Sequence, residues 1–79
     1  MKGMMKMISD LLLSQLRKKY PVGTRIRLLE MNDIQAPPIG TLGTVRGVDG
    51  IGSLLVSWDN GSHLNLVYGV DKCEIVNDK

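Results

Sequence analysis

The chain is 79 residues long and carries ten lysines and arginines against eight acidic residues; this formal net charge of +2 indicates neither nucleic acid nor a membrane as a partner by itself. Its length allows one small domain, and without phenylalanine the core must consist of Leu, Ile, Val and Met around a single tryptophan, Trp58. The lone Cys73 excludes an internal disulfide and fits a reducing compartment, and no run reaches the roughly 20 apolar residues of a membrane span.

The first predicted element is an amphipathic helix within residues 4–19. Arg17, Lys18 and Lys19 follow its apolar positions, and cations suit the C-terminal end of a helix dipole. Pro21 disfavours a helical Tyr20, so we expect the helix to end at Lys19 or just before. Ser9 is a second possible N-cap, which would place the start as late as Leu11. The helical spacing of three and four gives one apolar stripe, made of Met4, Met5, Ile8, Leu11, Leu12, Gln15 and Leu16.

From Val22 the apolar period changes to two, which predicts short β-strands. The first strand has its inner face at Val22, Thr24, Ile26 and Leu28. An irregular loop over residues 31–39 follows, because two prolines and an Asn-Asp pair break the alternation.

The second strand is predicted over residues 41–48, where Gly43 and Gly47 indicate a bulge or strong curvature beside Val45. The third strand has Leu54, Val56 and Trp58 on its inner face, and Asn60-Gly61 forms the next turn. Leu64 and Leu66 then lie on the inner face of a fourth strand, residues 68–71 form a turn, and residues 73–76 form the last strand.

Five short strands, a long first loop and two tight hairpins predict an all-β fold, a small SH3-like five-stranded barrel preceded by an amphipathic α-helix. The only internal boundary that we expect lies near Tyr20-Pro21. It separates the helix in residues 1–19 from the barrel in residues 20–79. The start resembles the basic end of a signal peptide, but its apolar run is too short, so we expect a cytoplasmic protein.

Four motifs together resemble an uncharacterised bacterial and phage family, the domain-of-unknown-function family numbered 4314, over about residues 20–76. The motifs are Tyr20-Pro21-Val22-Gly23-Thr24-Arg25-Ile26-Arg27-Leu28, Gln35-Ala36-Pro37-Pro38, the glycine-rich run from Gly40 to Asp49, and Val56-x-Trp58-Asp59-Asn60-Gly61-Ser62. The resemblance implies a small β-barrel, often near mobile elements, with no established activity. Tyr68 stands where a proline is expected and Cys73 where a large aromatic residue is common.

The sequence offers no catalytic set. A Cys–His nucleophile needs the two side chains within hydrogen-bond reach, whereas the alternation places His63 outside and Cys73 inside. The glycines lack the lysine and the helix of a phosphate loop, and no zinc-ligand spacing is present. We therefore expect no enzyme, no cofactor, no metal and no small-molecule substrate.

Basic side chains suggest one candidate site. Arg25 and Arg27 share the outer face of the first strand, and Arg46 lies on the neighbouring strand, so the three could contact phosphates of a nucleic acid. Glu30 and Asp49 could instead neutralise this patch across the strands. Nucleic-acid binding is the alternative function.

The helix suggests the other candidate site. Ile8, Leu12 and Leu16 could cover the open end of the barrel and complete its core. The apolar stripe could instead pair with a second copy or with another protein, since methionine-rich surfaces adapt to partners; a helix on a membrane surface is a third and weaker possibility. Protein interaction, including a homodimer, is the leading hypothesis. The candidate interface is Met4, Met5, Ile8, Leu11, Leu12 and Leu16.

Overall fold

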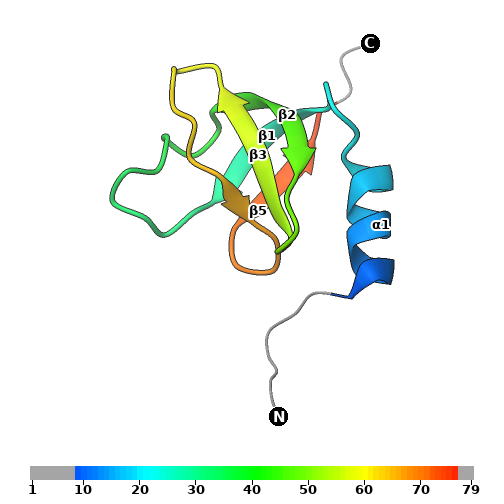
Figure 1. Ribbon diagram of the computed structural model, residues 1–79. Helices are drawn as coiled ribbons and strands as arrows, with labels where there is room; N and C mark the ends of the chain where they lie inside the picture. Colours follow the sequence, from blue (N-terminus) through cyan, green and yellow to red (C-terminus); the bar gives the residue numbers. More distant parts are fainter. Residues whose placement is uncertain (1–8, 77–79) are drawn as a thin grey trace.

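The computed structural model describes residues 9–76, which form one short helix and a five-stranded antiparallel sheet (Figure 1). The helix stands beside the sheet rather than in line with it. The elements in chain order are α1 (Asp10–Lys19), β1 (Arg25–Glu30), β2 (Leu42–Val48), β3 (Ser53–Trp58), β4 (Leu66–Val67) and β5 (Lys72–Ile75).

The sheet has the strand order β4-β3-β2-β1-β5. The first four strands form a meander, and β5 returns to pair with β1, where Arg27 lies opposite Glu74. The five strands are confirmed. The sheet is open, however, with β4 and β5 at its two edges, so a closed barrel is not confirmed.

Ser9 is the N-cap of α1 within the described residues, because its side chain accepts the N–H of Leu12 at 3.1 Å. At the other end, the N–H of Tyr20 donates to the carbonyl of Leu16, and Pro21 follows. The predicted end of the helix is therefore confirmed. The predicted helical residues 4–8 lie outside the described residues.

The first strand begins later than the alternation predicted. Val22 is exposed rather than inward-facing, and β1 starts at Arg25. The reason is a turn before the strand: the N–H and the hydroxyl of Thr24 both donate to the carbonyl of Pro21, at 3.0 and 2.6 Å. Gly23 has a φ of +96°, which extended strands do not adopt.

The bulge predicted for β2 is present, and Gly43 has in addition a packing role that the sequence did not predict. The register between β2 and β3 shifts between Val45 and Gly47, which confirms the bulge. Gly43 lies against the ring of Trp58, so closely that an added Cβ would be 2.7 Å from Cε3 of the indole. A glycine is therefore required at this position for packing.

The fourth strand is shorter than predicted because its first part is bound locally. The indole N–H of Trp58 donates to the carbonyl of Leu64 at 2.8 Å, and the N–H of Leu64 donates to the hydroxyl of Ser62 at 3.2 Å. Only Leu66–Val67 pairs with β3. Leu64 still packs against the core, half-buried.

One apolar core joins the helix to the sheet. Leu16 and Tyr20 of the helix end contact the same cluster as Ile26 and Trp58. Leu13 is also buried, although the predicted stripe left it out. The remaining core residues come from the strands and from the loop after β1: Leu28, Met31, Val45, Leu54, Val56 and Leu66.

Candidate functional site

A groove of about 400 Å³ opens between the end of α1 and the segment that joins β4 to β5. We call it the helix-end groove. Its lining combines aromatic, aliphatic, basic and acidic side chains from the end of α1, from β1, β4 and β5, and from the turn before β5. The lining residues are Lys19, Tyr20, Leu29, Leu66, Tyr68, Gly69, Asp71, Lys72 and Cys73.

The end of the helix forms one wall of this groove. Because the chain leaves the helix at Tyr20, the phenol ring turns into the core and is 6% exposed. Lys19 stays at the surface, with its Nζ 5.4 Å from the centre of the Tyr20 ring, within the range of a cation–π contact. The basic last turn that suits the helix dipole thus also supplies a cation to the groove.

A tight turn from Val67 to Asp71 forms the opposite wall. The Asp71 carboxylate accepts the N–H of Val67 at 2.8 Å, and the carbonyl of Val67 accepts the N–H groups of Val70 and Asp71 at 3.1 and 2.9 Å. Gly69 provides the positive φ of +88°. These bonds fix the turn and present Tyr68, which is 45% exposed, at the edge of the groove.

Tyr20 and Cys73 meet at the back of the groove, with the thiol Sγ 4.0 Å from the phenol oxygen. Burial, and to a lesser extent Cys73, raises the pKa of Tyr20 to about 12. Burial also raises the pKa of the Cys73 thiol, and this outweighs the lowering effects of Tyr20 and Lys19. Both groups are therefore protonated near neutral pH. His63 is exposed and does not line the groove.

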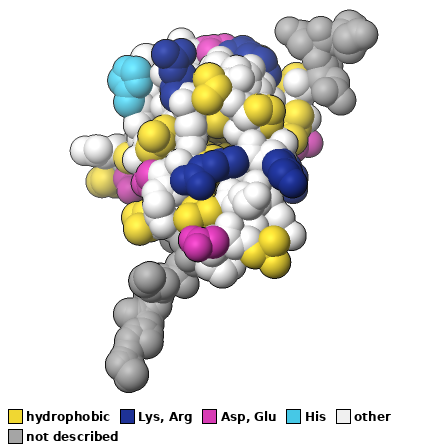
Figure 2. All heavy atoms as spheres, turned by 45° about the vertical axis from the view of Figure 1, so that its right-hand side comes forward, with side chains coloured by type: hydrophobic (Ala, Val, Ile, Leu, Met, Phe, Trp, Pro, Cys, Tyr) yellow, Lys and Arg dark blue, Asp and Glu magenta, His cyan; other side chains and the backbone are white. Residues whose placement is uncertain are grey.

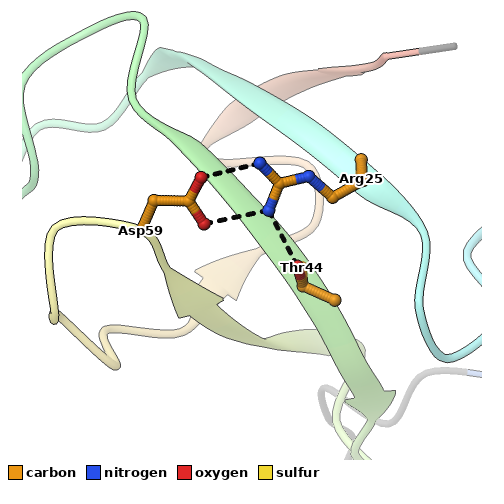
Figure 3. Close-up of polar contacts among 3 residues, drawn as sticks. All are labelled: Arg25, Thr44 and Asp59. Carbon is orange, nitrogen blue, oxygen red and sulfur yellow. Dashed lines mark hydrogen bonds and ion pairs between the residues drawn. The ribbon is translucent and has the colours of Figure 1, made fainter. Parts of the chain in front are cut away.

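The predicted basic patch is largely engaged in ion pairs. Arg25 holds Asp59 by two hydrogen bonds of 2.9 and 2.6 Å and also donates to the hydroxyl of Thr44 at 2.9 Å (Figure 3). The hydrogen bonds that Asp59 accepts from Arg25 lower the pKa of the Asp59 carboxyl. Arg27 pairs with Glu74 at 2.6 Å.

The carboxylates that neutralise the patch are not the two that the sequence suggested. Glu30 lies 3.6 Å from Lys72 instead, and Asp49 accepts the N–H groups of Ile51 and Ser53, which closes the β2–β3 turn. Arg46 is exposed on β2 and makes no ion pair with the described residues. Figure 2 shows one face of the molecule, on which basic side chains are interspersed with hydrophobic, acidic and other side chains.

The helix candidates divide into two groups. Met4, Met5 and Ile8 lie outside the described residues. Of the others, Leu11 is 69% exposed, Leu12 packs half-buried against the core, and Leu16 is 3% exposed. Leu16 therefore belongs to the core of its own chain, and Leu11 is the only described member that projects fully into solvent.

The described residues contain neither a metal-ligand cluster nor a membrane-spanning helix. No group of three or more His, Cys, Asp or Glu side chains in residues 9–76 could hold a metal ion. Within the same range, no helix is long and apolar enough to cross a bilayer.

The sequence matches the family described as "Domain of unknown function (DUF4314)" over residues 9–76. The chain belongs to this family. The resemblance expected over about residues 20–76 is confirmed, and the DUF4314 match also includes α1. No curated protein and no solved structure is similar enough to match the chain.

Sequence reasoning did not identify the helix-end groove of this DUF4314 protein. The groove depends on the approach of the helix end to β5, and that approach is a property of the tertiary structure. One signal was present: Tyr68 is an aromatic residue where the family resemblance suggested a proline, and it now lies half-exposed at the groove.

Proposed function

We propose that the protein is a small non-enzymatic binding module that recognises another protein through the helix-end groove. The observation that carries this proposal is exposed apolar surface beside a turn that hydrogen bonds hold in place. Leu29 and Tyr68 are 43% and 45% exposed, and they line the helix-end groove, one wall of which is the hydrogen-bonded turn from Val67 to Asp71. Binding to such a preformed surface costs little conformational entropy.

The helix contributes to this function by its last turn, through Lys19 and Tyr20. Its buried Leu13 and Leu16 hold it against the sheet, so they are not available to a partner. Leu11 remains as an exposed apolar residue on the same helix and is a candidate for a second contact with a protein or with another copy of the chain.

Nucleic-acid binding through Arg25, Arg27 and Arg46 has less support. Two of the three guanidinium groups are bound to carboxylates at 2.6 Å, and a phosphate would have to displace those carboxylates. Arg46 then remains as a single cation, which attracts a nucleic acid only weakly.

Two finer features of the prediction fit the same proposal. The meander of four strands, the return of β5 beside β1 and the bulge in β2 support an SH3-like arrangement of the sheet. The single, half-buried Cys73 supports a reducing compartment, the cytoplasm.

Site-specific photocross-linking tests the proposed function. The full chain carries benzoylphenylalanine in place of Tyr68 and, as the matched control, in place of the exposed Asn60, which does not line the groove. In host cells we expect protease-sensitive adducts at position 68 and not at position 60. Adducts that nuclease removes, or equal labelling at both positions, would contradict a protein-binding groove.

A further inference from the structure

We propose that the helix-end groove accepts an extended segment of the partner protein, which adds to the free edge of β5 and carries carboxylates beside an apolar side chain. This inference rests on the proposed function and adds the backbone conformation and the charge of the partner. Three observations support it: the open edge of β5, the uncovered apolar surface along it, and the two lysines of the groove.

The first observation is the open edge of β5. The N–H of Val76 donates to the carbonyl of Arg25, and the ladder continues with Arg27 opposite Glu74. In an antiparallel ladder, alternate residues direct their N–H and C=O groups to opposite sides, so those of Cys73 and Ile75 point away from β1. No loop or helix residue in 9–76 makes a backbone hydrogen bond to them. An edge of this kind accepts an added strand.

The second observation is the surface beside that edge. Ile75 lies opposite Ile26, which is fully buried, yet Ile75 itself is 40% exposed. Within residues 9–76, the side chains leave this end of the sheet partly uncovered. Since Lys72 and Cys73 belong to β5 and also line the groove, a segment that pairs with Cys73 enters the groove directly. There its apolar side chain would contact Leu29 and Tyr68.

The third observation is the charge at the groove. Lys19 has no carboxylate within ion-pair distance in residues 9–76. Lys72 lies 3.6 Å from Glu30, and these side chains are 70% and 63% exposed, so the pair is loose and strongly screened. The single carboxylate in the lining, Asp71, is bound to the N–H of Val67. The groove thus offers two cations, and a partner segment with carboxylates complements them.

Selection from a random seven-residue peptide library on the full chain tests the charge of the partner. We expect enrichment of sequences with Asp or Glu beside an apolar residue. A labelled peptide from that set should bind the double variant Lys19→Glu/Lys72→Glu about tenfold more weakly, which corresponds to about 1.4 kcal/mol. The control is Lys18→Glu, because Lys18 is exposed on the same helix and does not line the groove. It should bind within about twofold of the parent chain.

A second measurement tests strand addition. N-methylation of one peptide residue at a time removes single N–H donors and leaves the side chains unchanged. Loss of binding at alternate positions is the expected pattern for a strand paired on one side. Equal tolerance at every position would overturn the inference of an added strand. Circular dichroism of each variant verifies that the fold is retained.

The remaining outcomes separate this inference from the proposed function. Enriched peptides without carboxylates, bound equally by the double variant, would overturn the acidic segment and leave the protein-binding groove standing. If no peptide is enriched but position 68 cross-links to proteins, the acidic segment is likewise wrong and the protein-binding groove still stands. If single-stranded DNA or RNA displaces the labelled peptide at a concentration below that of the peptide, and if the adducts at position 68 are nuclease-sensitive, both the inference and the proposed function are wrong. Dimerisation through the groove, seen by light scattering, would replace the extended segment with a second copy.

Discussion

The outer face of β1 and the helix-end groove both present basic side chains, and they use them differently. On β1, Arg25 and Arg27 are each fixed to a carboxylate at 2.6 Å. At the groove, Lys19 lies beside the Tyr20 ring and has no ion pair within residues 9–76, and Lys72 has a loose partner at 3.6 Å. The number of cations on a surface therefore does not identify a binding site. A binding site is identified by cations that are not already paired with carboxylates of the same chain and that have exposed apolar area beside them.

The largest expected effect comes from the core that both regions share. Trp58→Ala removes an indole that is 3% exposed and packs against Gly43, and it also removes the donor to Leu64. We expect the free energy of unfolding to fall by about 3–5 kcal/mol, enough to unfold a domain of this size. Unfolding followed by circular dichroism measures the loss of stability, and NMR line widths show whether the variant is folded. A folded, cooperative variant would contradict the assigned packing of β3 and would leave both regions intact.

Gly43→Ala tests the same core from the side of β2. Its new Cβ would lie 2.7 Å from Cε3 of Trp58 and 2.8 Å from Cγ1 of Val56, so the core must shift. We expect a loss of about 2–3 kcal/mol in urea unfolding. Gly47→Ala is the matched control in the same strand, since its Cβ would be 3.8 Å from the nearest atom of Leu55. Equal stability of the two variants would show that the close packing of Gly43 is unimportant.

High pH should affect the groove wall more than the ion-paired face. The pKa of Tyr20 is raised to about 12 in the folded state, against about 10 in an unfolded chain, so the stabilisation is complete below pH 10. It should decline as the pH rises from about 10 to about 12, by on the order of 2 kcal/mol. Urea unfolding at pH 9 and pH 11.5 measures this.

Tyr20→Phe is the control for that prediction, because it keeps the buried ring and removes the titrating hydroxyl. The difference between the parent chain and this variant should change with pH in the stated direction. If the parent chain and the variant lose stability equally between the two pH values, Tyr20 is not the group responsible.

The smallest effect is expected at the ion-paired face. Asp59→Asn removes the charge that Arg25 binds, and urea unfolding at pH 7 should show a small loss of stability. Because the pKa of Asp59 is lowered in the folded state, its contribution is present above the ordinary carboxyl pKa and is lost as the pH falls through the folded-state value. The parent chain and the variant should therefore converge in acid. A constant difference from pH 7 to pH 2 would contradict the role of this ion pair.

Much of the fold followed from local patterns. The alternation of Leu54, Val56 and Trp58 correctly assigned the buried face of β3, and Pro21 correctly ended the helix. The start of β1 was wrong, because the turn that binds Thr24 to Pro21 takes precedence over the alternation. The helical period placed Leu11 and Leu12 on the apolar stripe and left out Leu13, which is buried, because the phase of the helix depends on where it meets the sheet.

The site was less predictable than the fold for a related reason. Alternation indicates the face on which Arg25 lies, but it does not indicate its partner Asp59, which is 34 residues away and reached across β2. The helix-end groove likewise combines residues that are far apart in the sequence, from Lys19 to Cys73. Pairings at this distance depend on registers and on a bulge, neither of which a single sequence determines.

The pairing of β1 with β5 also has a kinetic consequence. Arg27 and Glu74 are 47 residues apart, so the ladder closes a long loop whose entropic cost precedes most of the contacts that repay it. The ten-residue helix is too short to be stable by itself and depends on a core that includes Leu66. Folding should therefore proceed in one concerted step, slowly for so small a chain, with no stable half.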